Sequence, residues 1–229
     1  MAFHLDHQSV RWGECESGLA MGVSVLLAAG SFVACCAAHM LSQEGRSKTF
    51  DQSADGYGRG EGCGSTSLCA QPPNSAHACY SFLTAAVRGS AVNQDGHTAT
   101  LTAPNGPSQQ MVLTAALVQA GAASARDAVH LETHGTGTAL GDPIEVGAVK
   151  QVMQPGCTEG SPLGLGAVKP NVGHLEGSAG MSVVMKVVLV VKGLTAPRGL
   201  HLRRLNEHCL LYTSPSPRDL STSRMPSSA

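Results

Sequence analysis

Hydrophobic residues along this chain gather in short segments that alternate with glycine-rich or polar stretches. The pattern predicts, in order, the end of a helix up to about residue 12, a strand at 18–27, a helix at 31–41, a strand at 81–92, a helix at 107–119, a strand at 129–132, a helix from 142, a strand at 163–168 and a helix at 176–192. Because strands and helices alternate, we predict an α/β fold.

Three stretches break this pattern. Residues 43–64 are polar and glycine-rich and are predicted to be loop, and the apolar pattern is weak at 65–77, where Pro72 and Pro73 interrupt any regular element. The last residues, 209–229, are rich in Ser, Pro and Arg and show no periodicity. A segment of this composition buries no core, so we predict a disordered tail.

Residues 17–38 contain no charged side chain, and this length suffices to cross a bilayer. Ser17, Ser24 and Ser31 dilute the hydrophobicity, and no Trp or Tyr borders the stretch. A buried strand followed by a buried helix gives the same apolar run, and we prefer that interpretation. A membrane span is the alternative, which carbonate extraction would test.

Composition narrows the function classes. The chain has 229 residues, of which 42% are hydrophobic, with 27 further glycines, as in folded globular proteins. Charged residues make up only 14%, which suits a largely buried or oligomeric protein, and the net charge is −1. With 3% aromatic residues and no basic excess, the sequence argues against nucleic-acid binding.

Eight cysteines include no C-x-x-C pair and no zinc-like spacing with histidine, so no metal site is predicted. The first residues lack the basic and apolar regions of a signal peptide. We therefore expect reduced thiols in the cytoplasm or another intracellular compartment.

His134 follows a predicted strand, within Thr133-His134-Gly135-Thr136-Gly137-Thr138. The carboxyl end of a strand is where α/β folds place their sites, and glycine lets the backbone approach a ligand. A histidine hydrogen-bonded within a turn is the alternative.

Glu145 has a simple structural interpretation, in which Asp142, Pro143 and Glu145 form a capping box at the start of a helix. A second role for Glu145 requires a cation. Lys169 is a candidate, because it lies between an apolar strand and an apolar helix and there needs a partner.

His174 is predicted just before a helix, whose N-terminal dipole disfavours imidazolium. A neutral imidazole donates a hydrogen bond without carrying charge. Two such histidines converging on one carbonyl oxygen would stabilise an enolate or oxyanion. A satisfied core histidine is the other interpretation. The alternating glycines of residues 55–64 fit no nucleotide-binding fingerprint and indicate closely packed backbone.

Five segments stand out by their order and spacing: residues 55–64, 88–96, 101–110, 132–145 and 168–180. Together they resemble the ketosynthase domain of type I polyketide synthases, and the resemblance extends over residues 1–208. The resemblance implies a thiolase-like layered fold of two related halves, of which 1–88 and 89–208 would be the parts present, and a homodimer in the intact enzyme.

The resemblance also implies decarboxylative Claisen condensation of malonyl units carried on the phosphopantetheine of an acyl carrier protein, with no directly bound cofactor. His134 and His174 match the two histidines that bind the malonyl thioester oxygen. Lys169 and Glu145 match a supporting pair, and Thr136 and Thr138 match threonines near the phosphopantetheine arm.

The sequence departs from this family in three places. No cysteine lies in the nucleophile motif Asp-Thr-Ala-Cys-Ser-Ser, and the later Gly-Phe-Gly-Gly-Thr-Asn segment is absent. Residues 65–81 and the tail after 208 look foreign to the family. We therefore expect an incomplete fold and a fragment without a nucleophile, inactive in condensation. A cysteine-less decarboxylase, a non-catalytic dimerisation or docking module and a fatty-acid synthase condensing domain stay open as alternatives.

Overall fold

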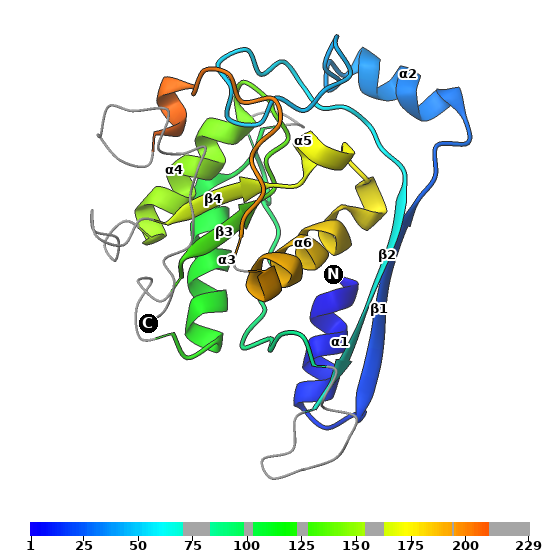
Figure 1. Ribbon diagram of the computed structural model, residues 1–229, viewed down its shortest axis with the longest axis vertical. Coiled ribbons are helices and arrows are strands. Elements are labelled where there is room, and N and C mark those ends of the chain that lie inside the picture. The colour runs from blue at the N-terminus through cyan, green and yellow to red at the C-terminus, as the bar shows by residue number, and fades with distance from the viewer. Residues whose placement is uncertain (71–82, 99–102, 123–127, 154–162, 194, 211–229) are drawn as a thin grey trace.

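The computed structural model describes residues 1–70, 83–98, 103–122, 128–153, 163–193 and 195–210 (Figure 1). The predicted tail lies outside the described residues from 211 onward, as does most of the Pro72-Pro73 region. The elements, in chain order, are α1 Ala2–Arg11, β1 Ser17–Ser24, α2 Ala29–Ala37, β2 Gly62–Cys69, α3 Gly106–Gln119, β3 His130–Thr133, α4 Gly141–Met153, β4 Gly164–Ala167, α5 Lys169–Val172, the 3₁₀ helix η4 Glu176–Ser178, α6 Ala179–Gly193 and the 3₁₀ helix η5 Glu207–Cys209.

Two small sheets organise the described chain. Strands β1 and β2 pair antiparallel, from Ser17 opposite Cys69 to Ser24 opposite Gly62. Strands β3 and β4 pair parallel, from His130 opposite Gly164 onward. Figure 1 shows the β1–β2 sheet along one side of the molecule, with α1 and α6 beside it, whereas α3 and α4 lie next to β3 and β4. Strands and helices alternate as predicted for an α/β fold.

The main hydrophobic core lies under α4. Val146, Val149 and Met153 from this helix pack with Leu205 and Cys209 from the C-terminal segment. Apolar side chains of α3, β3 and β4 complete the cluster. Cys209, which the sequence pattern assigned to the tail, is 3% exposed and belongs to the folded part. The core thus supports the ends of β3 and β4, where His134 and Lys169 emerge.

The sequence predicted a loop at 43–64 followed by an irregular region at 65–77. This prediction is wrong for Gly62–Cys69, which form strand β2. Its polar residues Ser65 and Ser67 point outward and are exposed, so they cost little in the strand. Gly64 points inward and lies against α6, where an added Cβ would approach the Cβ of Met181 to 2.9 Å. Main-chain pairing with β1 over the whole strand therefore overrides the missing apolar pattern.

The predicted strand at 81–92 is wrong within the described part, 83–92, which contains no strand. Side chains from 83 to 88 are exposed, so the apolar residues there have no sheet to face. The predicted buried helix at 31–41 forms at Ala29–Ala37 instead, and none of its residues is buried. Within the described residues, no helix is both long and apolar enough to cross a membrane.

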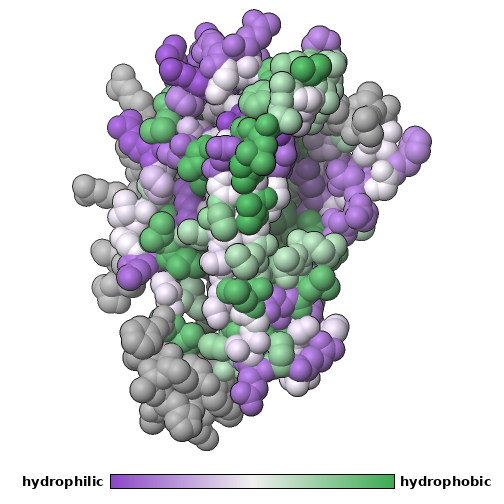
Figure 2. All heavy atoms as spheres, turned by 90° about the vertical axis from the view of Figure 1, so that its right-hand side faces the viewer, coloured by the Kyte–Doolittle hydropathy of each residue, from purple (hydrophilic) through white to green (hydrophobic). Residues whose placement is uncertain are grey.

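Strand β1 carries its large apolar side chains on the outside. Leu19, Met21 and Val23 are each more than half exposed, whereas Ala20 on the opposite face is 2% exposed. Figure 2, which looks onto this side of the molecule, shows hydrophobic side chains running along the β1–β2 sheet. We call Leu19, Met21 and Val23 the β1 outer row.

Candidate functional site

His134 and His174 come together at one cavity. His134 is the first residue after β3, and His174 lies between α5 and η4. Their ring centroids are 5.6 Å apart, and the ring planes meet at 82°. Both side chains line a cavity of about 820 Å³. Two histidines 40 positions apart in the sequence therefore face the same space, as expected from the sequence.

Lys169 determines the tautomer of His134. Its Nζ lies 3.2 Å from Nδ1 of His134 and also donates to the carbonyl oxygen of that residue. Lys169 is 2% exposed, so it has the partner that its burial requires. Because an ammonium only donates, Nδ1 of His134 is the acceptor and Nε2 carries the proton.

His174 reaches the same state through a different partner. The backbone N–H of Glu176 donates to its Nδ1 at 2.9 Å, which again leaves the proton on Nε2. The ring of Tyr57 lies 4.8 Å from that of His174 on another side. In both imidazoles, Nε2–H is therefore the donor that is available to a ligand.

Both imidazoles are neutral at pH 7. Desolvation by the surrounding protein, followed by the nearby charge of Lys169, lowers the pKa of His134 and of His174 to about 4. His134 as a residue is exposed, and its side chain meets solvent in the cavity that it lines. The expected neutral state is therefore found, but its cause differs from the expected one. Helix α6 begins only at Ala179, and η4 is too short for a strong dipole.

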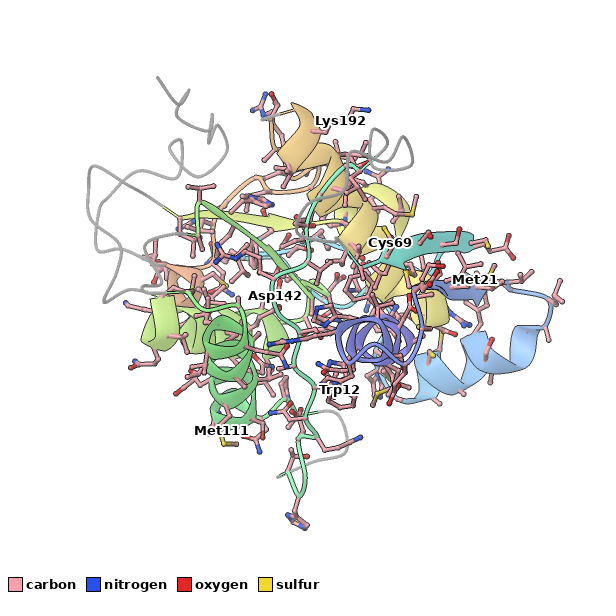
Figure 3. All side chains as sticks on the ribbon, turned by 90° about the horizontal axis from the view of Figure 1, so that it is seen from below. Trp12, Met21, Cys69, Met111, Asp142 and Lys192 are labelled. Atoms are coloured by element: carbon pink, nitrogen blue, oxygen red, sulfur yellow. The ribbon has the colours of Figure 1, made fainter. Side chains whose placement is uncertain are left out.

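Glu145 and Asp142 hold the loop that carries His134. Glu145 accepts hydrogen bonds from the backbone N–H groups of His134, at 2.5 Å, and Gly135, at 2.9 Å. Asp142 accepts from the N–H groups of Gly137, at 3.0 Å, and Phe50, at 2.8 Å. The predicted capping box is therefore wrong, because both carboxylates face the preceding loop. Figure 3 shows Asp142 toward the middle of the molecule.

Lys169 and Glu145 act on His134 from two sides without pairing with each other. Glu145 forms no ion pair among the described residues, since both its oxygens accept from loop amides. Burial raises the pKa of Glu145, and burial lowers that of Lys169 to about 8, while the negative charge of Glu145 acts on Lys169 in the opposite direction. The expected direct pair is replaced by contacts that run through His134.

Two glycines let this loop pack tightly. Gly135 and Gly137 have φ angles of +48° and +78°, which side chains rarely allow. A Cβ at Gly137 would lie 2.7 Å from the backbone nitrogen of Lys48. Thr136 and Thr138 alternate with these glycines and line the same cavity, with their hydroxyl oxygens 3.3 Å apart.

Sequence reasoning missed a buried ion pair in the cavity wall. Glu132 on β3 accepts from Lys186 on α6 at 2.8 Å and contacts Nε2 of His130 at 3.2 Å. This pair ties the strand that leads into His134 to the helix that follows His174. An acidic residue in a short apolar strand and a lysine in an apolar helix were the available signals.

Two of the alternating glycines before β2 form backbone hydrogen bonds with His174. The N–H of His174 donates to the carbonyl of Gly58 at 2.7 Å, and the N–H of Gly60 donates to the carbonyl of His174 at 3.1 Å. A Cβ at Gly60 would clash with the carbonyl oxygen of Val172. The interpretation of this stretch as closely packed backbone is correct.

The described residues at this cavity include neither a thiol nor a set of metal ligands. No group of three potential metal ligands occurs among the described residues. None of the six described cysteines lines the cavity of His134 and His174. What the arrangement offers is two neutral hydrogen-bond donors, held from behind by a lysine, a glutamate and backbone groups.

Comparison with known proteins gives this site a context. Residues 1–74 match the family described as beta-ketoacyl synthase, N-terminal domain, and residues 84–203 match beta-ketoacyl synthase, C-terminal domain. Over 208 residues, 91% of this chain, the sequence is 44% identical to a phenolphthiocerol/phthiocerol polyketide synthase of Mycobacterium tuberculosis. It is 43% identical to erythronolide synthase EryA2 of Saccharopolyspora erythraea over the same length. The chain spans only 9% and 6% of these two proteins.

Solved structures agree with these sequence matches. The ketosynthase from module 6 of the bacillaene synthase of Bacillus subtilis superimposes with a TM-score of 0.82 over 90% of this chain, at 33% identity. The oxazolomycin ketosynthase domain of Streptomyces albus gives a TM-score of 0.84 over 93% of this chain, also at 33% identity. The chain spans 36% of each of these two structures.

Proposed function

Since this chain belongs to the beta-ketoacyl synthase family and has its thiolase-like fold, we propose that it carries the carbonyl-binding part of a polyketide-type condensing site. The proposed substrate is a malonyl-type thioester on the phosphopantetheine arm of an acyl carrier protein. One observation carries the proposal. His134 and His174 line one cavity, and each accepts a hydrogen bond at Nδ1, so that each offers Nε2–H as a donor.

The chemistry follows from where charge develops. Decarboxylation breaks the bond between the carboxylate carbon and the α-carbon, and carbon dioxide leaves. The electron pair moves into an enolate, whose negative charge lies largely on the thioester oxygen. Two preorganised N–H donors at that oxygen each contribute about 2.7–4 kcal/mol to the transition state. Neutral imidazoles suit this role because each donates a hydrogen bond without itself carrying charge.

Condensation requires a second partner for the enolate. Its carbon attacks an acyl thioester carried on a cysteine, and the thiolate leaves. The family's cysteine motif is absent from this sequence. We therefore propose that residues 1–229 by themselves decarboxylate the malonyl thioester without condensing it. The enolate takes a proton from water to give the acetyl thioester. Thr136 and Thr138 would bind the phosphopantetheine arm, and the intact enzyme would be a homodimer.

Release of carbon dioxide from malonyl-loaded acyl carrier protein tests the proposal. His134→Ala and His174→Ala should each slow release by about 10²–10³-fold, and His208→Ala, which changes an exposed histidine far along the chain, should not. Mass spectrometry should detect no acyl adduct on the protein after incubation with an acyl thioester. A stoichiometric adduct would contradict the proposed lack of condensation.

Another outcome would identify a different function. Carrier binding without carbon dioxide release, unaffected by either substitution, would indicate a non-catalytic docking module. The relatives of this chain are polyketide synthases, which favours that branch over a fatty-acid synthase condensing domain.

A further inference from the structure

Arg59 is a buried cation that the proposed chemistry leaves unused. Its side chain is 2% exposed, and it comes from the loop just before β2. One guanidinium nitrogen donates to the hydroxyl of Ser31 at 2.7 Å, and the guanidinium carbon lies 4.6 Å from the ring centroid of Phe32. The other terminal nitrogen forms an ion pair with Glu176. Arg59 therefore joins α2 to the residue that follows His174 by two positions.

Glu176 is the residue that determines the tautomer of His174. Its backbone N–H is the donor to Nδ1 of His174. Its φ angle is +44°, a left-handed conformation that a residue with a side chain adopts only when its surroundings impose it. The ion pair with Arg59 is the contact that holds the side chain of Glu176, and so it restrains this backbone conformation.

The backbone on both sides of Arg59 holds His174 as well. Gly58 accepts a hydrogen bond from the N–H of His174, and Gly60 donates one to its carbonyl oxygen. The main chain at 58–60 thus holds the backbone of His174, while the Arg59 side chain holds Glu176, whose backbone N–H donates to Nδ1 of His174. Arg59 does not line the cavity. Besides these contacts, its positive charge helps to lower the pKa of His174.

We propose that Arg59 is a positioning residue that keeps Nε2–H of His174 available as a donor, by holding the N–H of Glu176 against Nδ1. Its relevance to catalysis rests on the function proposed above. Without Arg59, Glu176 relaxes to a right-handed conformation, and its N–H turns away. Nδ1 of His174 is then free to take a proton, either as the other neutral tautomer or as imidazolium.

Nitrogen NMR of the full chain labelled at its histidines tests this directly, without substrate. In the unsubstituted chain, His174 should show an unprotonated Nδ1 and a protonated Nε2. In Arg59→Met the Nδ1-protonated form should appear, and this change of tautomer is the deciding readout. The pKa of His174 should also rise, by about one unit or more, but loss of the positive charge of Arg59 contributes to that rise by itself. Arg46→Met makes the same chemical change at an exposed loop arginine and should leave His174 unchanged.

Arg59→Lys is the conservative variant. It keeps the positive charge at this position and provides a second test if Arg59→Met fails to fold. Lysine can pair with Glu176 but offers no planar face to Phe32, so it should shift His174 part of the way. The signal of His130, which contacts Glu132, reports whether the fold is kept. A folded Arg59→Met whose His174 keeps an unprotonated Nδ1 would overturn the proposal, even if its pKa rises. Because the readout needs no thioester, it stands or falls separately from carbon dioxide release.

Discussion

The ammonium nitrogen of Lys169 lies 3.2 Å from Nδ1 of His134. This contact decides which imidazole nitrogen carries the proton, and it places a positive charge beside a histidine that is already poorly solvated. Lys169 therefore both orients His134 and keeps it neutral. The catalytic value of the lysine in this account lies entirely in what it does to the histidine.

Lys169→Met should raise the pKa of His134 and should no longer restrict the imidazole proton to Nε2. An imidazole that is no longer held populates both neutral tautomers and a partly charged form, so carbon dioxide release should fall on the order of tenfold. Lys192→Met, at an exposed position near the end of α6, is the matched control and should retain full activity. Loss of release with an unchanged His134 pKa would show that Lys169 acts in some other way.

The pH dependence of carbon dioxide release should be bell-shaped. As pH falls through about 4, His134 and His174 become imidazolium and lose their neutral donor state. As pH rises through about 8, Lys169 loses its proton and no longer enforces the tautomer of His134. A rate profile recorded over roughly pH 3.5 to 9.5 checks both limbs. A limb near the ordinary histidine pKa of 6.5 would mean that the histidines are as solvated as free imidazole.

Asp51 should anchor the C-terminal segment. It accepts from the backbone N–H groups of Arg203, at 2.7 Å, and Arg204, at 2.8 Å, and from the N–H and hydroxyl of Ser53. Asp51→Asn keeps a single acceptor oxygen, and we expect a loss of about 2 kcal/mol in the free energy of unfolding, measured in urea. Glu207→Gln, an exposed carboxylate nearby, is the control.

The same aspartate predicts an acid-sensitive part of the stability. Desolvation alone would raise the pKa of Asp51, but hydrogen bonds from Ser53 and from the backbone of Arg204 and Arg203 lower it to about 2. A depressed folded pKa stabilises the fold at pH values above the unfolded value of 3.8, and this contribution disappears as pH falls through about 2. Asp51→Asn should remove this part of the pH dependence. If both proteins lose stability in parallel below pH 3.8, Asp51 does not contribute in this way.

The β1 outer row should promote self-association. Its three large apolar side chains lie on a strand with no charged residue, which is the arrangement that natural sheets avoid at exposed edges. Met21→Lys should shift the chain toward monomer in light scattering coupled to gel filtration. Ser67→Lys adds the same charge on β2 without removing apolar area, so it should change the distribution less. Equal effects of the two substitutions would indicate a general charge effect.

The histidine pair could be predicted from the sequence because its signals are local. Glycine and threonine around His134, and an irregular loop at His174, are visible in short segments. Strand β2 could not be predicted in the same way, because its pairing with β1 comes from main-chain hydrogen bonds over a long separation, which side-chain periodicity does not record. The apolar residues of 83–92 resemble a strand in their pattern, but this stretch pairs with no strand among the described residues.

The positions of the supporting groups were predictable only in part. Burial of Lys169 could be expected from its apolar neighbours, whereas its choice of His134 over Glu145 depends on how the loop folds back onto α4. The same holds for Arg59 and Glu176, which are 117 positions apart in the sequence. Contacts of this kind depend on tertiary packing and not on any local pattern.

The measurement that tests the central claim most directly is a nitrogen NMR titration of the histidines in the unsubstituted chain. We expect His134 and His174 both to be neutral at pH 7, with Nδ1 unprotonated and Nε2 protonated, and both to titrate near pH 4. Imidazolium at pH 7, or a proton on Nδ1 of either ring, would contradict the claim that this site presents two neutral donors to one oxygen.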